Sequence, residues 1–194
     1  PDDGEGQSVR SAESMAEAFD VKVICGQPNY AARGILAAKH ESRKGVEIFR
    51  VGGTTLNKNV IFFKLINMVT LSIAIFFKAL LKFRAKDRVL VVTTPPTLPF
   101  VSAIAALIRG AHYVLVIHDN YPEILFAAGK SKEGGAFATT LNYCNRWLFK
   151  HSSKVIVVSR DMELLVKRKT AGLDIPIAVI QNWAELETVR PTPR

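Results

Sequence analysis

The feature that most limits the fold of this chain is the alternation of short β-branched runs with longer segments of helical periodicity. Residues that favour β-strands are concentrated in six segments, Val21–Cys25, Glu47–Val51, Arg88–Val92, Tyr113–Ile117, Lys154–Val158 and Ile177–Ile180. Helical patterns occur at Ser8–Phe19, Asn59–Phe83, Leu98–Arg109, Phe137–Lys150 and Arg160–Lys169. Such alternation indicates repeated βα units, and almost continuously apolar strands indicate a parallel sheet covered on both faces. The sequence therefore predicts an α/β fold with a Rossmann-like, doubly wound parallel sheet.

The length of the chain suits one large domain. Its 194 residues, 48% of them hydrophobic, can bury a sizeable core. We expect residues 1–184 to form one Rossmann-like domain and residues 185–194, which contain two prolines and two arginines, to form a linker or cut end. Doubly wound sheets have the strand order 3-2-1-4-5-6, in which the first strand is central and precedes the glycine-rich turn. This chain begins at that turn. The first strand is therefore expected to be missing and the chain to be a fragment.

The formal net charge of +9 favours anionic partners. Nucleic acid is not expected among them, because the basic residues are scattered and no helix-turn-helix, zinc-finger or aromatic RNA-binding signature is present. The two cysteines, Cys25 and Cys144, lack metal-ligand spacing and are typical of buried thiols in a reducing compartment. We expect no metal site and a location in the cytoplasm, with a peripheral position on the inner face of the cytoplasmic membrane as one of the two interpretations of the apolar segment Val60–Phe83.

The long apolar segment Val60–Phe83 leaves two interpretations open. Thirteen residues separate Lys64 from Lys78, fewer than the roughly 18 needed to span a bilayer, so a spanning helix is not expected. Phenylalanines beside these lysines and Lys82 are typical of an amphipathic helix that lies on an anionic membrane surface. A core helix whose lysines extend to the solvent has the same composition.

A glycine-rich segment at residues 4–9 precedes the first predicted helix. Its backbone N–H groups could bind a phosphate at the helix N-terminus, which makes Gly4, Gly6 and Gln7 candidate binding residues. The alternative is a flexible capping turn with Ser8 as the N-cap. An NAD-dependent reductase is not expected, because the third glycine of the fingerprint and the acidic ribose ligand after Val21–Cys25 are both absent.

Polar or proline-containing loops follow most of the predicted strands. They are Cys25–Gly34, Thr93–Thr97, Ile117–Glu123, Ser159 and Gln181–Trp183. Each loop alone could be an ordinary turn, because proline, glycine and small polar residues are common in turns. Since ligands of open α/β sheets bind outside the carboxyl ends of the strands, we expect these loops to line one crevice.

His118 is the candidate catalytic residue of this crevice. A neutral imidazole at a strand end can exchange hydrogen bonds with a sugar hydroxyl or assist proton movement near neutral pH. The alternative is a histidine bonded within its own loop, with Asp119 capping a helix that begins near Tyr121. No Ser-His-Asp triad or metal cluster can be assembled from the sequence.

In order along the chain, these stretches resemble the N-terminal domain of the retaining family-4 glycosyltransferases of the GT-B fold, especially those that build bacterial surface polysaccharides. The similar stretches are Gly4–Ser8, Gly26–Tyr30, Thr94–Pro96, Asp119–Glu123, Val155–Ser159 and Asn182-Trp183. The resemblance implies transfer of a sugar from an NDP-sugar to a lipid-linked or glycan acceptor, with retention at the anomeric carbon.

The resemblance also implies roles for individual residues. His118 would face the reacting sugar, and the glycine segment would face the donor diphosphate. Asp119 and Glu123 would organise their loop rather than act as bases. The substrate-binding positions implied in this way are Gly4, Gly6, Gln7, Tyr30, Pro95, Pro96, Asp119, Tyr121, Glu123, Ser159 and Asn182.

In the resembled family a C-terminal domain holds the nucleotide, and this sequence contains no such domain. The NDP-sugar is therefore expected to bind through a domain absent from this chain, and no cofactor is expected beyond that donor substrate. The isolated chain should then show no sugar transfer. The alternative function is a membrane-associated, non-catalytic acceptor-binding subunit of a split glycosyltransferase.

Overall fold

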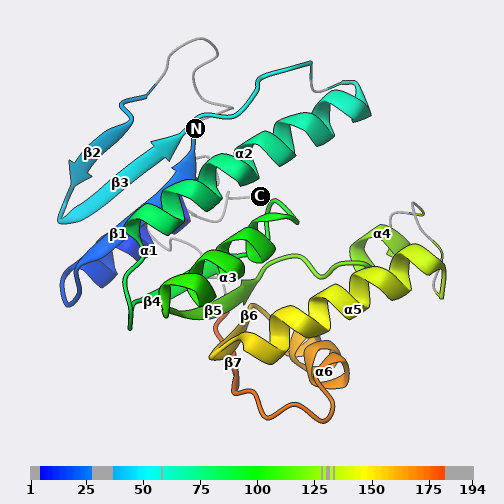
Figure 1. Ribbon diagram of the computed structural model, residues 1–194. Coiled ribbons are helices and arrows are strands. Elements are labelled where there is room, and N and C mark those ends of the chain that lie inside the picture. The colour runs from blue at the N-terminus through cyan, green and yellow to red at the C-terminus, as the bar shows by residue number, and fades with distance from the viewer. Residues whose placement is uncertain are drawn as a thin grey trace, which may run out of the picture.

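The computed structural model describes residues 5–27, 37–57, 59–127, 129, 132 and 134–181, with side chains from residue 10 onward. The helices are α1 (Glu5–Ala16), α2 (Ile61–Lys82), α3 (Leu98–Arg109), α4 (Glu123–Ala127), α5 (Ala136–His151) and α6 (Arg160–Lys169). The strands are β1 (Val21–Gly26), β2 (His40–Arg43), β3 (Val46–Val51), β4 (Arg88–Val92), β5 (His112–Ile117), β6 (Lys154–Val157) and β7 (Ile177–Val179). The predicted α/β class is confirmed (Figure 1).

The described strands form two sheets. One has the order β1-β3-β2, with β1 parallel and β2 antiparallel to β3, and the other has the order β4-β5-β6-β7 with every pair parallel. Placed side by side, the two sheets reproduce the doubly wound order, except that no described strand lies between β1 and β4. That interval is where the order 3-2-1-4-5-6 has its first strand.

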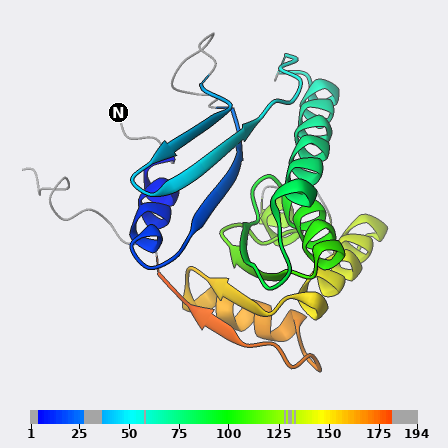
Figure 2. The ribbon, with the colours of Figure 1, turned by 60° about the vertical axis from the view of Figure 1, so that its left-hand side comes forward.

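Helices cover both faces of the three-stranded sheet. Ala12 of α1 packs with Val46 and Ile48 on one face. Phe49 points to the opposite face, where α2 lies, because successive strand residues alternate in direction. Figure 2 shows α1 and α2 on the two sides of this sheet.

The main core lies around β5 and β6. Leu115, Val155 and Val157 are at most 2% exposed and pack with residues of α3, α5 and α6. The buried Tyr113 hydroxyl donates a hydrogen bond to the carbonyl of Leu148, which joins β5 to α5. This core fixes the strands whose carboxyl ends carry the predicted site loops.

The element boundaries differ from the predicted ones mainly at the N-terminus. Helix α1 begins at Glu5 rather than Ser8, so Gly6 and Gln7 lie in its first turn and not in a loop. The strand β2 was not predicted. It forms because Lys44 and Gly45, both with positive φ (46° and 81°), make a two-residue turn that returns the chain antiparallel to β3.

Candidate functional site

The loops that follow β4 and β5 are hydrogen-bonded to each other. The Thr93 hydroxyl oxygen accepts from the backbone N–H groups of His118 and Asp119, each at 3.2 Å. The Thr94 hydroxyl donates to Asp119 Oδ2 at 3.0 Å. The carboxylate of Asp119 is therefore engaged in holding the two loops together at the carboxyl edge of the sheet.

A second set of contacts fixes the far side of the β5 loop. The carbonyl oxygen of Tyr121 accepts from Asn145 Nδ2 at 2.7 Å and from Lys169 Nζ at 2.9 Å. Lys169 also forms an ion pair with the Glu123 carboxylate. Burial lowers the pKa of Lys169, and the hydrogen bond to Glu123 opposes this shift. The loop is thus attached to α5 through Asn145 and to α6 through Lys169.

Two cis peptide bonds shape the same region. They are Thr94–Pro95 after β4 and Tyr121–Pro122 after β5. Pro122 is almost completely buried, whereas Pro95 and Pro96 are only partly buried. The predicted residues Pro95 and Pro96 therefore lie on the accessible part of the edge, beside Asp119.

His118 is exposed, and within the described residues its imidazole makes no hydrogen bond or ion pair. Only its backbone N–H is engaged, with Thr93. The structure therefore does not support the interpretation of a histidine bonded within its own loop. The ring is available for a ligand at the carboxyl end of β5.

A small recess lies beneath the two loops. Thr93, Pro96, Asp119, Asn120 and Tyr121 line it on the loop side, and core residues of β5 and α5 line it below. Its volume of about 40 Å³ has room for about one water molecule, which occupies ~30 Å³, and not for a sugar. A substrate of that size would have to bind on the outer surface of the loops.

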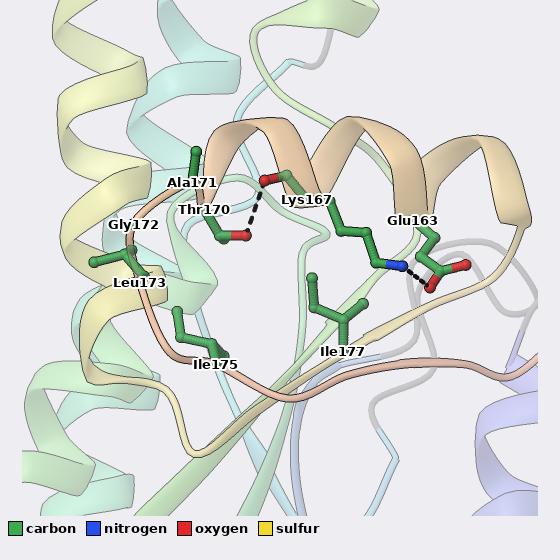
Figure 3. Close-up of a pocket in the computed structure, with 8 residues that line it drawn as sticks. All are labelled: Glu163, Lys167, Thr170, Ala171, Gly172, Leu173, Ile175 and Ile177. Carbon is green, nitrogen blue, oxygen red and sulfur yellow. Dashed lines mark hydrogen bonds and ion pairs between the residues drawn. The ribbon is translucent and has the colours of Figure 1, made fainter.

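A larger pocket of about 330 Å³ lies at the opposite edge of the four-stranded sheet, beside the amino end of β7 (Figure 3). One side of α6 and six residues of the following segment line it, namely Thr170, Ala171, Gly172, Leu173, Ile175 and Ile177. Its charged groups, Glu163 and Lys167 of α6, form an ion pair at 2.7 Å. No predicted site residue lines this pocket. This pocket is therefore separate from the candidate site.

The remaining predicted residues are placed as follows. Ser159 caps α6, because its hydroxyl accepts from the backbone N–H of Met162 at 3.2 Å. Gly6 and Gln7 lie at the beginning of α1. Gly4, Tyr30 and Asn182 lie outside the described residues.

Sequence reasoning did not single out three residues that support the site. Thr93 begins the predicted loop Thr93–Thr97, so its position at a strand end was the available signal. Asn145 and Lys169 lie in helical patterns, 24 and 48 residues from the carbonyl oxygen that both contact.

The described residues contain no group of three or more His, Cys, Asp or Glu side chains that could hold a metal ion.

Comparison with known proteins supplies the family. Residues 7–183 match the family described as "Glycosyl transferase 4-like domain", which covers all four strands of the parallel sheet and their loops. The chain is also similar to the "Probable glycosyltransferase WbjE" of Pseudomonas aeruginosa, with 32% identity over 123 residues. That match covers 62% of this chain and 30% of the length of the relative.

Proposed function

Because this chain belongs to the glycosyl transferase 4-like family, we propose that it is the acceptor-binding domain of a transferase that moves a sugar from an NDP-sugar to a lipid-linked or polysaccharide acceptor. The observation that carries the proposal is the family match over residues 7–183. The match includes both loops that are joined by Thr94 and Asp119.

The acceptor would bind on the outer surface of the loops after β4 and β5. Pro95 and Pro96 supply a rigid, partly exposed surface there, because each proline fixes its own φ. His118 lies at the neighbouring strand end with an unengaged ring. A hydroxyl group on an acceptor or donor sugar can exchange hydrogen bonds with such a ring, which donates from one nitrogen and accepts at the other when neutral.

The donor diphosphate would lie near the beginning of α1. The first N–H groups of a helix have no partner within the helix, and the helix dipole adds positive potential there. Gly6 in this first turn has no side chain to keep a phosphate away from the backbone. Negative charge that develops on the leaving diphosphate would be stabilised at this end.

The proposal divides the reaction between two domains. Residues of this chain would position the acceptor and contact the transferred sugar, and a nucleotide-holding domain would supply most of the binding energy for the donor. Proximity of the two substrates accounts for a large part of such catalysis. The isolated chain would therefore bind acceptor without catalysing transfer.

Ligand titration followed by NMR tests this division. Backbone amide shifts of the isolated chain are measured with a polyprenyl-phosphate-linked N-acetylhexosamine in micelles, with empty micelles, and with UDP-glucose or GDP-mannose. We expect the glycolipid alone to shift the amide signals of the non-proline residues in segments 93–97 and 118–123. Equal shifts with empty micelles, or tight binding of either nucleotide sugar without glycolipid binding, would contradict the proposed role. Turnover by the isolated chain would show that no second domain is needed.

A further inference from the structure

A row of exposed apolar side chains runs along α2. Leu65, Val69, Ile73, Phe77 and Leu81 follow one another at intervals of four residues and are between 47% and 79% exposed. Residues spaced by four lie on one side of a helix. Among the described residues α2 is the one helix long and apolar enough to cross a membrane by length and composition, and only 11% of its apolar window is buried.

The opposite side of α2 carries two of the three lysines that the sequence suggested for membrane binding, whereas the third, Lys64, is exposed near the beginning of the helix. Lys78 and Lys82 lie over the ring of Phe49 in β3, with their Nζ atoms 5.0 Å and 4.0 Å from its centre. On this side Leu71 also packs within 3.5 Å of the positions that a side chain on Gly26 or Gly53 would occupy. Lys78 and Lys82 therefore face the sheet, which agrees with the interpretation of a core helix for this side of α2.

Helix α3 extends the apolar area. It packs beside α2, and the Ser72 hydroxyl lies 2.6 Å from that of Thr97 where α3 begins (Figure 1). Ile104, Leu107 and Ile108 are between 42% and 62% exposed. We define these three residues and the five exposed residues of α2 as the α2–α3 apolar surface.

Cations gather at the end of this surface where both helices finish. Arg84, Lys86, Arg88 and Arg109 are all exposed there, and Arg109 Nε donates to the carbonyl oxygen of Phe83 at 3.1 Å. Residues 60–111 contain seven Lys or Arg residues and one Asp. The segment therefore has a net charge of +6, out of +9 for the whole chain. Neither α2 nor α3 contains an acidic residue.

We propose that the α2–α3 apolar surface lies on an anionic membrane, with α2 in the plane of the interface. Its 22 residues give α2 a length of about 33 Å at 1.5 Å per residue. An apolar helix face of this kind enters the boundary between headgroups and acyl chains, and cations beside it attract anionic headgroups. The side of α2 that packs on β1 and β3 keeps the helix on the surface of the membrane. Charge complementarity favours lipid, because a basic edge with Asp87 as the single acidic residue of segment 60–111 would repel a second copy of the same edge.

Co-sedimentation with sucrose-loaded vesicles tests the proposal. The vesicles contain either equal parts of phosphatidylglycerol and phosphatidylcholine or phosphatidylcholine alone. We expect the chain to partition onto the anionic vesicles, and the triple variant Leu65→Gln, Ile73→Gln, Phe77→Gln to bind them about tenfold less strongly or weaker still. The matched control is Phe137→Gln, Tyr143→Gln, Leu164→Gln, which changes residues of similar exposure on α5 and α6 and should bind like the wild type.

The cations are tested separately. Arg84→Gln, Lys86→Gln, Arg88→Gln should weaken binding to the anionic vesicles, whereas Lys150→Gln, Lys154→Gln, Arg160→Gln, with the same loss of charge, should weaken it less. Equal effects of the two charge variants would overturn the role of the basic edge.

A direct measurement of contact with the acyl chains completes the test, because it does not require a variant that binds vesicles less strongly. In a Phe77→Trp variant, lipids brominated on their acyl chains should quench the added fluorescence. Unchanged binding of the apolar triple variant, or no quenching at position 77, would overturn the proposal. So would a wild-type dimer that the triple variant abolishes while neither protein binds vesicles, because the surface would then be an interface between copies.

Discussion

The Thr94 hydroxyl donates a hydrogen bond to the carboxylate of Asp119, 3.0 Å away, and this bond joins the loops after two neighbouring parallel strands. Each loop contains a cis-proline peptide bond, and His118 stands directly before Asp119. The hydrogen bond between Thr94 and Asp119 therefore fixes the position of the loop that presents the imidazole ring of His118. Its loss should disturb binding at the loop surface as well as stability.

A double-mutant cycle measures this bond. Thr94→Val and Asp119→Ala should each lower the free energy of unfolding by about 1 kcal/mol, since each removes the hydrogen bond that the Thr94 hydroxyl donates to the partly exposed Asp119 carboxylate. Together they should cost less than the sum of the two, by about 0.5–1 kcal/mol. Thr94→Ser retains the hydroxyl and serves as the control. Strict additivity in urea unfolding would show that the two side chains do not interact in solution.

The two partners of the ion pair between Lys169 and Glu123 should differ in how much stability is lost when each is replaced. Glu123→Gln leaves a partly buried ammonium group without its counter-ion, and should lower the free energy of unfolding by about 1–3 kcal/mol. Lys169→Met removes the buried charge itself and keeps most of the packing, so it should cost less. Urea midpoints of the two variants decide the order. A larger loss for Lys169→Met would mean that its hydrogen bond to the Tyr121 carbonyl dominates.

Gly53 should not tolerate a side chain. A Cβ atom there would lie 3.1 Å from the backbone nitrogen of Leu71 and 3.2 Å from its Cα, which leaves no room unless α2 moves. Gly53→Ala should lower the free energy of unfolding by about 1–3 kcal/mol. Gly52→Ala is the matched control, because no atom lies within 4 Å of its added Cβ. Equal thermal midpoints for the two variants would contradict the close contact between this loop and α2.

The acid sensitivity of the three-stranded sheet should depend on Glu13. The hydrogen bond from Lys44 holds the pKa of the Glu13 carboxyl below its usual value of 4.5, and the nearby cation of Arg43 adds to this effect. A carboxyl group whose pKa is lower in the folded state stabilises the fold above its unfolded pKa, and this contribution is lost as the pH falls through the folded pKa. Glu13→Gln should therefore lose less stability than the wild type when the urea midpoint is measured first at neutral pH and then below pH 4.5.

The fold was predictable where burial and sequence pattern coincide. The strands β4, β5 and β6 are apolar after their first residue and lie close to their predicted bounds. The strand β2 reads His-Glu-Ser-Arg and has no apolar pattern, because it is an edge strand with mostly exposed side chains. Its existence depends on pairing with β3, which is a tertiary property.

The orientation of α2 could not be predicted for a related reason. Its sequence is apolar on nearly all sides, so periodicity does not reveal which side meets the sheet. Packing decides this, and it places Lys82 over Phe49 rather than toward the solvent side of the helix. At the site, the loops at the carboxyl edge were predictable from strand topology. The contribution of Lys169 was not, because it depends on where α6 ends relative to a loop 46 residues earlier.

The role of His118 can be tested in an enzyme that contains the nucleotide-holding domain. His118→Ala should change the free energy of unfolding by no more than about 0.5 kcal/mol, because the ring is exposed and has no partner among the described residues. Turnover should fall much more, by about 10²-fold or more, if the ring exchanges a hydrogen bond or a proton with the reacting sugar in the transition state. The backbone of His118 stays in place, since its N–H bonds to Thr93 independently of the ring. A mutation at this position therefore removes a functional group without moving the loop.

His112 provides the control, because it lies exposed at the opposite, amino end of the same strand β5. His112→Ala should leave both kcat and the urea midpoint near the wild-type values. An effect on KM alone at His118 would assign the ring to binding that is equally strong in the ground state and the transition state. An effect on kcat with an unchanged midpoint would assign it to the transition state, as proposed. A lowered midpoint with nearly normal kcat would identify His118 as a structural residue, and the candidate site would then consist of the proline loops and the Thr94–Asp119 bond alone.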